Sequence, residues 1–194
     1  LLNGVDHLDA LRATVGSDHV LGGAAYVFAH VARPGVVEQS GGPGVIAFGE
    51  LDGRTSDRVD RLRAVCRQAS ILHSDERDIL VVMWEKLAFI CAQAGMTAAA
   101  RTSIGEVRES PEAWAMFRRI ASEVVAVARS EGVRVGPDTV DAVVSFAEQL
   151  HPDARSSLHD DLVAGRRLEL DALHGSVVRR ARRHRLDAPA SESV

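Results

Sequence analysis

ILVVMWEKLAFIC, residues 79–91, is the most apolar run of this 194-residue chain and predicts a buried helix. Among 23 lysine and arginine residues, the run contains the only lysine, Lys86. Burial can lower the pKa of a lysine until it releases a proton near neutral pH, whereas arginine stays charged. Lys86 is therefore a candidate general acid or Schiff-base residue. The alternative is a lysine whose stem lies in the apolar region while its ammonium reaches solvent.

Helical patterns dominate the chain on both sides of this run. Ser74 or Asp75 can cap the Lys86 helix, and Gly95 is expected to end it. Further helices are predicted at residues 5–15, from Ser56 to Cys66, from Ser110-Pro111 to Gly132, at 138–150, from Ser156-Ser157 to Gly165, and at 169–183. The chain is thus predicted to be mainly α-helical after residue 53.

The first 50 residues contain the only strand signals. Continuous apolar character over residues 19–31 predicts a buried strand, and residues 35–39 and 45–48 predict two short strands. The cluster at residues 40–44, SGGPG, predicts a hairpin turn. A dinucleotide phosphate loop is disfavoured there, because a strand rather than a helix follows the glycines.

Composition narrows the class of protein. Hydrophobic residues make up 46%, charged residues 26% and aromatic residues 4%, so alanine and aliphatic side chains must build the core. A net charge of −4 gives no general case for a nucleic-acid partner. Residues 79–94 are expected to be too short and too charged to span a membrane, and no signal peptide is recognisable. Cys66 and Cys91 lack metal-ligand spacing and predict small buried side chains in a cytoplasmic protein.

Polar residues outside the apolar run offer weaker candidates. Asn3, before the first helix, is either an ordinary turn residue or a loop amide pointing into a cleft. Ser156-Ser157 is first a helix cap, although a hydroxyl at a helix N-terminus can also bind an anion. Glu169 favours a helix N-terminus or pairs with a buried cation. Gly175, inside a predicted helix, indicates close packing of another element.

A basic cluster ends the last predicted helix. It consists of Arg179, Arg180, Arg182, Arg183 and Arg185. We interpret it as a solvated helix end whose charge suits the helix dipole. Nucleic-acid binding is the alternative, but no aromatic residues interleave to stack on bases.

Taken in order, these segments resemble ketopantoate reductase (2-dehydropantoate 2-reductase). The matching text is LLNGV, VLGGAAYVFAH, PGVVEQSGGPGVIAFGELDG, MWEKLAFICA, SIGEVRESP, EVVAVARSEGV and SSLHDDLVAGRRLELDALHGSVV. The resemblance implies the C-terminal half of a Rossmann-type NADP-binding domain at residues 1–73. It implies a helical substrate and dimerisation domain, like the C-terminal domain of 6-phosphogluconate dehydrogenase, at residues 74–194.

The same resemblance implies roles for four residues. Lys86 would donate a proton while NADPH reduces a 2-oxo acid, in the type of reaction that serves pantothenate biosynthesis. Glu169 would be the active-site acid that holds the lysine or the cofactor. Asn3 and Ser157 would orient substrate, with Asn3 also on the cofactor. A homodimer is possible, and no nucleic-acid or membrane partner is expected.

Two departures from the family pattern shape the expectations. Ile90 and Ala94 stand where the family carries amides, one and two helical turns after the lysine, which leaves the exact substrate open. The glycine-rich first half of the Rossmann domain is missing from the sequence, so we expect a truncated chain with weak NADPH binding and little activity. A non-catalytic helical interaction or dimerisation module is the alternative function.

Overall fold

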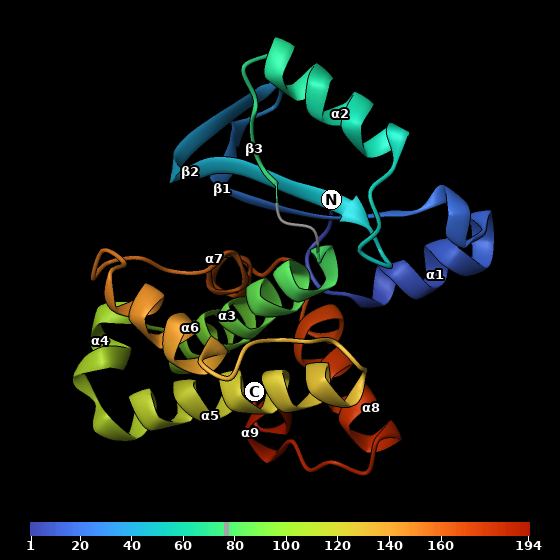
Figure 1. Cartoon of the computed structure of the whole chain (residues 1–194). Helices are drawn as coiled ribbons and strands as arrows, with labels where there is room; N and C mark the ends of the chain where they lie inside the picture. The colour runs from blue at the N-terminus through green and yellow to red at the C-terminus, as the bar shows by residue number, and fades with distance from the viewer. Residues whose placement is uncertain (76–77) are drawn as a thin grey trace. The chain divides into compact units, whose positions relative to one another are not determined.

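The computed structural model describes residues 1–75 and 78–194, and the chain divides into two compact units (Figure 1). The first unit comprises residues 1–2 and 7–83, and the second comprises residues 3–6 and 84–194. The first contains a small sheet with helices, whereas the regular elements described in the second are helical. The prediction of a mainly helical chain with a small strand-rich part near its N-terminus is confirmed.

Among the described residues, three strands form the sheet of the first unit. They are β1 (Leu21–Arg33), β2 (Val36–Glu50) and β3 (Leu72–Ser74), in the order β1-β2-β3. β1 and β2 are antiparallel, and β2 and β3 are parallel. The short strand β3 was not predicted from the sequence.

The hairpin turn lies at Pro34-Gly35 rather than in the glycine cluster, so the predicted turn at residues 40–44 is wrong. Pro34 presets the first turn position and Gly35 has a φ of 79°, which suits the second. The cluster is instead a bulge inside β2, because the partner of β1 shifts from Val45 at Tyr26 to Gly41 at Phe28.

Two helices accompany this sheet. They are α1 (Asp6–Val15), followed by the short 3₁₀ turn η1 (Ser17–His19), and α2 (Asp57–Gln68). Ser56 caps α2 as predicted, because its side chain accepts a hydrogen bond from the Val59 N–H. Val59 and Cys66 of α2 pack with Phe48 of β2, so α2 covers one face of the sheet.

Seven α-helices and a π-helical segment are described in or leading into the second unit. They are α3 (Ile79–Ala100), α4 (Ile104–Glu109), α5 (Pro111–Ser130), α6 (Thr139–Glu148), α7 (Ser157–Val163), η2 (Asp171–Gly175), α8 (Ser176–Arg183) and α9 (Pro189–Glu192). α5 contacts α4, α6, α8 and α9. Ser110 caps α5 as predicted, and the unpredicted α4 begins with a capping box of Ser103 and Glu106.

α3 differs at both ends from its prediction. Asp78, rather than Ser74 or Asp75, caps it, because the Asp78 carboxylate accepts a hydrogen bond from the Val81 N–H at 3.4 Å. Gly95 lies inside the helix rather than at its end. A Cβ atom at Gly95 would lie 2.7 Å from Nε2 of His174, so glycine makes room for that ring.

The length of α3 also corrects the expectation about membranes. Its 22 residues are long and apolar enough to span a bilayer by composition alone. However, 67% of the apolar window is buried inside the structure, which is the pattern of a core helix. Small aliphatic residues dominate the buried set, and Cys66 and Cys91 are free and buried, as predicted.

Candidate active site

Lys86 lies on α3 and is partly buried. Burial lowers the pKa of its ammonium from the usual value of 10.5, and the negative charge of Glu169 opposes that shift. The fall has the sign that a proton donor working near neutral pH requires. The lysine singled out by composition is therefore a desolvated cation under the influence of a carboxylate.

Glu169 lies in the loop between α7 and η2, one residue before the turn that begins at Leu170. The helix predicted from residue 169 therefore starts two residues later, at Asp171. The side-chain amide of Asn3 donates a hydrogen bond to Oε2 of Glu169 at 3.3 Å. The structure thus brings together Asn3 and Glu169, which are 166 positions apart in the sequence, and Glu169 acts electrostatically on Lys86.

Ser157 is the exposed first residue of α7, and Ser156 is the residue that caps this helix. Oγ of Ser156 accepts a hydrogen bond from the His159 N–H at 3.1 Å. The same Oγ lies 2.8 Å from Oγ1 of Thr97 on α3, and Thr97 donates to the Gln93 carbonyl at 2.8 Å. This buried chain of hydroxyls fixes the start of α7, and with it Ser157, relative to α3.

The face of α3 that carries Lys86 is mostly apolar. Ile90 is partly exposed and Ala94 is buried, one and two turns beyond the lysine. Gln93, which is 8% exposed, follows Lys86 by seven residues and so lies on nearly the same face. Sequence reasoning missed Gln93, although its seven-residue spacing from the lysine was the available signal.

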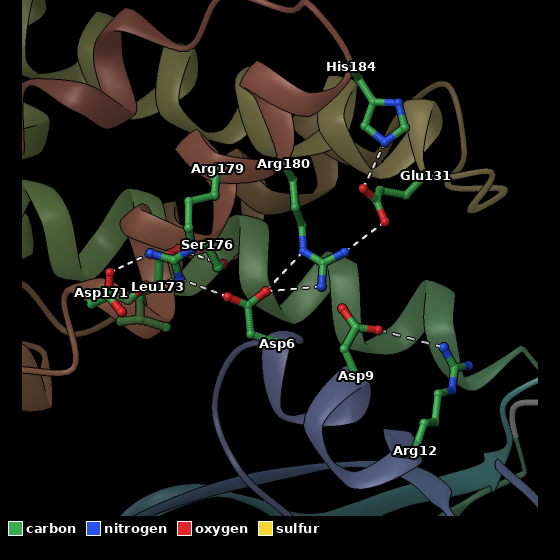
Figure 2. Close-up of polar contacts among 10 residues, drawn as sticks. All are labelled: Asp6, Asp9, Arg12, Glu131, Asp171, Leu173, Ser176, Arg179, Arg180 and His184. Carbon is green, nitrogen blue, oxygen red and sulfur yellow. Dashed lines mark hydrogen bonds and ion pairs between the residues drawn. The ribbon is translucent and has the colours of Figure 1, made fainter. Parts of the chain in front are cut away.

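The arginines at the end of α8 are not simply a solvated helix end, so that interpretation is wrong in part. Arg180 is buried and pairs with Asp6 at 3.0 Å and with Glu131 at 2.7 Å. Arg179 pairs with Asp6 at 2.8 Å, and Arg182 pairs with Glu192 at 2.9 Å. Figure 2 shows Arg179 and Arg180 both pointing toward Asp6. These acids lie too far away in sequence for a local pattern to reveal the pairs.

The arrangement places an ammonium of lowered pKa, a carboxylate and an amide in the helical unit. An ammonium of this kind can donate a proton to a developing oxyanion and stabilise its charge. The amide and carboxylate can position a polar ligand by hydrogen bonds. Proton donation to the oxygen of a bound carbonyl compound is the chemistry that this set of groups supports.

Two family descriptions match the chain. "Ketopantoate reductase PanE/ApbA" matches residues 1–53, and "Ketopantoate reductase PanE/ApbA C terminal" matches residues 78–194. A 2-dehydropantoate 2-reductase from Halobacterium salinarum is 32% identical over 198 residues. That alignment covers 100% of this chain and 63% of the relative, so the chain spans less than two thirds of the relative's length.

Solved structures share the fold. The crystal structure of 2-dehydropantoate 2-reductase from Geobacter metallireducens superposes with a TM-score of 0.89 at 26% identity, covering 100% of this chain and 64% of that one. D-mandelate dehydrogenase, in its ternary structure with NADH and anilino(oxo)acetate, superposes with a TM-score of 0.88 at 20% identity, covering 100% and 63%. The second likeness shows the fold alone.

Proposed function

The chain belongs to the ketopantoate reductase PanE/ApbA family, and we propose that it supplies the proton donor of a reductase that converts a 2-oxo acid to a 2-hydroxy acid. NADPH is the proposed reductant, and 2-dehydropantoate or a related 2-oxo acid is the proposed substrate. The observation that carries the proposal is Lys86, a partly buried lysine whose pKa burial lowers while the charge of Glu169 opposes the change. No contact among the described residues favours the alternative of a non-catalytic interaction module.

Lys86 has the central chemical role in this proposal. Reduction of a 2-oxo group leaves a developing alkoxide that needs a proton and a nearby positive charge. The Lys86 ammonium supplies both, because its lowered pKa eases proton release and its charge stabilises the oxyanion before transfer. Arginine could supply the charge but not the proton.

Asn3 and Glu169 are the proposed contacts of the nicotinamide. A carboxamide carries one acceptor oxygen and two donor hydrogens, and an amide beside a carboxylate offers matching donors and acceptors. Asn3 and Glu169 form such a pair, joined at 3.3 Å. The bound nicotinamide would supply a hydride, while these two residues orient it and Glu169 holds the charge of Lys86.

The substrate contacts on α3 favour a less polar 2-oxo acid. Ile90 and Ala94 give the helix apolar positions one and two turns beyond Lys86, and Gln93 supplies the single amide of α3. Ser157, exposed at the start of α7, is the proposed contact for the substrate's polar end. We therefore propose that a 2-oxo acid with a bulky apolar side chain is reduced at least as well as 2-dehydropantoate.

The two parts of the chain take different roles in the proposal. Residues 1–73 are the proposed C-terminal half of a Rossmann-type NADP-binding domain, and residues 74–194 are the proposed substrate and dimerisation domain. Free, buried cysteines suit a reducing compartment, so we propose the cytoplasm as its location.

The test is an assay of the chain alone and of a chimera. In the chimera, an N-terminal segment of the Halobacterium relative is fused before Leu1. Oxidation of NADPH and of NADH is followed with 2-dehydropantoate and with an aromatic 2-oxo acid. We expect turnover in the chimera with NADPH preferred, and we expect Lys86→Arg to abolish it.

Arg167→Lys is the matched control, because Arg167 is exposed and the substitution exchanges the same two residue types. It should leave turnover unchanged. A folded chimera that binds NADPH but reduces neither substrate would contradict the proposal. Full turnover in the Lys86→Arg chimera would remove Lys86 from the role of proton donor.

A further inference from the structure

Residues 3–6 belong to the helical unit although they precede the sheet in sequence. No regular element forms before Asp6, and Gly4 has a φ of 80° in the left-handed region. The conformation of this segment therefore depends on contacts with the rest of the unit. Val5, in the middle of the segment, is buried at 3% exposed.

The segment contacts the stretch that carries Glu169 at successive points. Asn3 donates to Glu169 at 3.3 Å. A Cβ atom at Gly4 would lie 2.7 Å from the Ala172 carbonyl oxygen, so the two backbones approach closely. These contacts place the segment that carries Asn3 beside the segment that carries Glu169. Neither contact is strong by itself.

Arg179 joins the same two segments through one guanidinium. Its Nη2 donates to Oδ2 of Asp6 at 2.8 Å and to the Asp171 carbonyl at 3.0 Å, and its Nη1 donates to the Asp171 carboxylate (Figure 2). Asp6 lies three residues after Asn3, and Asp171 lies two residues after Glu169. The planar, five-donor fork of arginine can make these bonds at once, which a lysine ammonium cannot do with fixed geometry.

Gly175 makes room for this bridge. A Cβ atom there would lie 2.6 Å from Oδ1 of Asp171 and 3.0 Å from Nη1 of Arg179. The expected packing of another element against Gly175 is therefore replaced by the Asp171–Arg179 pair within the same helical stretch. The glycine lies where the π-helical segment joins α8.

Arg180 holds the other side of Asp6 from a buried position. Its Nε donates to Oδ1 of Asp6 at 3.0 Å, and its Nη1 donates to Glu131 at 2.7 Å. Glu131 in turn lies 2.8 Å from Nε2 of His184, and the Arg180 guanidinium lies 5.9 Å from the centre of the Trp84 ring. Arg180 is thus fixed on several sides, and salt screens a buried pair far less than an exposed one.

We propose that Arg179 and Arg180 are positioning residues that clamp Asp6, and through it hold the Asn3 amide on Glu169. The purpose of the clamp, which is to orient Asn3 for the reaction, rests on the proposed function. Its existence does not, since the geometry of Asn3 can be measured without substrate or cofactor. An ion-pair network that only stabilises the fold would leave the Asn3 side chain where it is when Arg179 and its two ion pairs, with Asp6 and Asp171, are removed.

The sequence offers a specific probe, because Asn3 is its only asparagine. Labelling the whole chain with ¹⁵N-asparagine therefore gives one pair of side-chain amide signals. Relaxation of these signals reports the order of the Asn3 amide on Glu169 in the native protein. We expect an ordered amide in the unaltered chain.

Arg179→Gln is the main variant, because 46% of the Arg179 side chain is exposed and its loss should leave the fold intact. We expect the order parameter of the Asn3 amide to fall below about 0.6, the range of flexible groups. Asp6→Ala should produce the same fall and creates no second asparagine. Arg182→Gln is the matched control on the same helix, where Arg182 pairs with Glu192 instead, and it should leave the Asn3 signals unchanged.

An Asn3 amide that stays ordered in folded Arg179→Gln and Asp6→Ala would overturn the clamp. If either variant fails to fold, Arg179→Lys keeps the charge without the fork. That variant should loosen Asn3 to an intermediate degree, and an unchanged amide there would likewise overturn the proposal. In the active chimera, a loosened Asn3 with unchanged kcat and KM would uphold the clamp while removing Asn3 from the proposed reaction. Failure of the clamp and failure of the proposed function therefore give different results.

Discussion

Lys86 and His174 are two basic groups of the helical unit whose pKa burial lowers, yet their surroundings differ. Lys86 is partly exposed and feels the charge of Glu169. His174 is 2% exposed, and burial lowers its pKa to about 4. The Cys91 backbone lies near enough to oppose that shift, but neither ring nitrogen has a well-formed hydrogen bond among the described residues.

The difference lies between a partly exposed group near an opposite charge and a fully buried group without one among the described residues. Lys86 combines partial solvent access with a nearby opposite charge, whereas His174 is buried beside Gly95 and its burial favours the neutral ring. Desolvation alone therefore does not mark a functional residue. The combination of desolvation with a nearby opposite charge is the better marker.

The largest expected effect is on catalysis at Lys86. In the active chimera, Lys86→Met should lower kcat by about 10²- to 10⁴-fold, the usual range for loss of a general acid. His174→Gln should change kcat far less, since His174 is placed outside the proposed chemistry. Steady-state kinetics of both variants measure the two losses of kcat. Similar losses would contradict the distinction between Lys86 and His174.

The next effect is a dependence of stability on pH that comes from His174. Its folded pKa of about 4 is below the ordinary 6.5, so the unfolded chain binds the proton first as pH falls. The free energy of unfolding should therefore be unaffected above pH 6.5 and fall by about 3 kcal/mol between pH 6.5 and 4. Urea titrations between pH 4 and pH 7 measure how steeply the free energy of unfolding changes with pH.

His151→Gln is the control for this slope, because 77% of the His151 side chain is exposed. His174→Gln should flatten the acid-side fall, while His151→Gln should leave it nearly unchanged. An equal slope in both variants would show that His174 is not the group responsible.

Local sequence signals predicted those elements whose cause is local. Ser56, Ser110 and Ser156 each cap the helix that follows, since a cap needs only its own first turn. The capping box at Ser103 and Glu106 was present in the sequence as the same kind of signal and was overlooked.

Long-range contacts explain the failures. Gly95 was expected to end a helix, because glycine commonly follows a helix. Its actual role is to make room for the ring of His174, which lies 79 positions away and cannot be inferred from the neighbours of Gly95. Lys86 stood out by composition, but only a family resemblance assigned Asn3 and Glu169 to one site, and their hydrogen bond was not predicted. The salt bridges from Asp6 to Arg179 and Arg180 were missed for the same reason, since they join opposite ends of the chain.

Gly95→Ala tests whether the ring of His174 packs directly against position 95. The new Cβ atom would lie 2.7 Å from Nε2 of His174, and we expect a loss of about 1 to 3 kcal/mol from overpacking. In a His174→Ala background the same change should be neutral or stabilising by up to about 1 kcal/mol, because alanine favours helix over glycine. Thermal or urea unfolding of the four proteins gives the answer, and equal losses in both backgrounds would rule out the contact.

The smallest effect is expected at Thr97, which is buried but satisfied by hydrogen bonds. Thr97→Val keeps the shape and removes the hydroxyl between Ser156 and the Gln93 carbonyl, so we expect a loss of about 1 to 2 kcal/mol. Thr14→Val is the control, since Thr14 makes the same bond to the carbonyl four residues earlier but is exposed. Equal changes in unfolding free energy would show that the contact with Ser156 contributes nothing.

The central claim is that Lys86 is a desolvated ammonium tuned by Glu169. As the only lysine of the chain, it gives one signal when the protein is labelled with lysine enriched in ¹³C at Cε, and the shift of that signal can be titrated against pH. We predict a pKa below the usual 10.5 that falls further in Glu169→Gln and does not move in Glu148→Gln, where the altered carboxylate is exposed and absent from the charges acting on Lys86. A pKa at or above the usual value that is indifferent to Glu169→Gln would contradict the account.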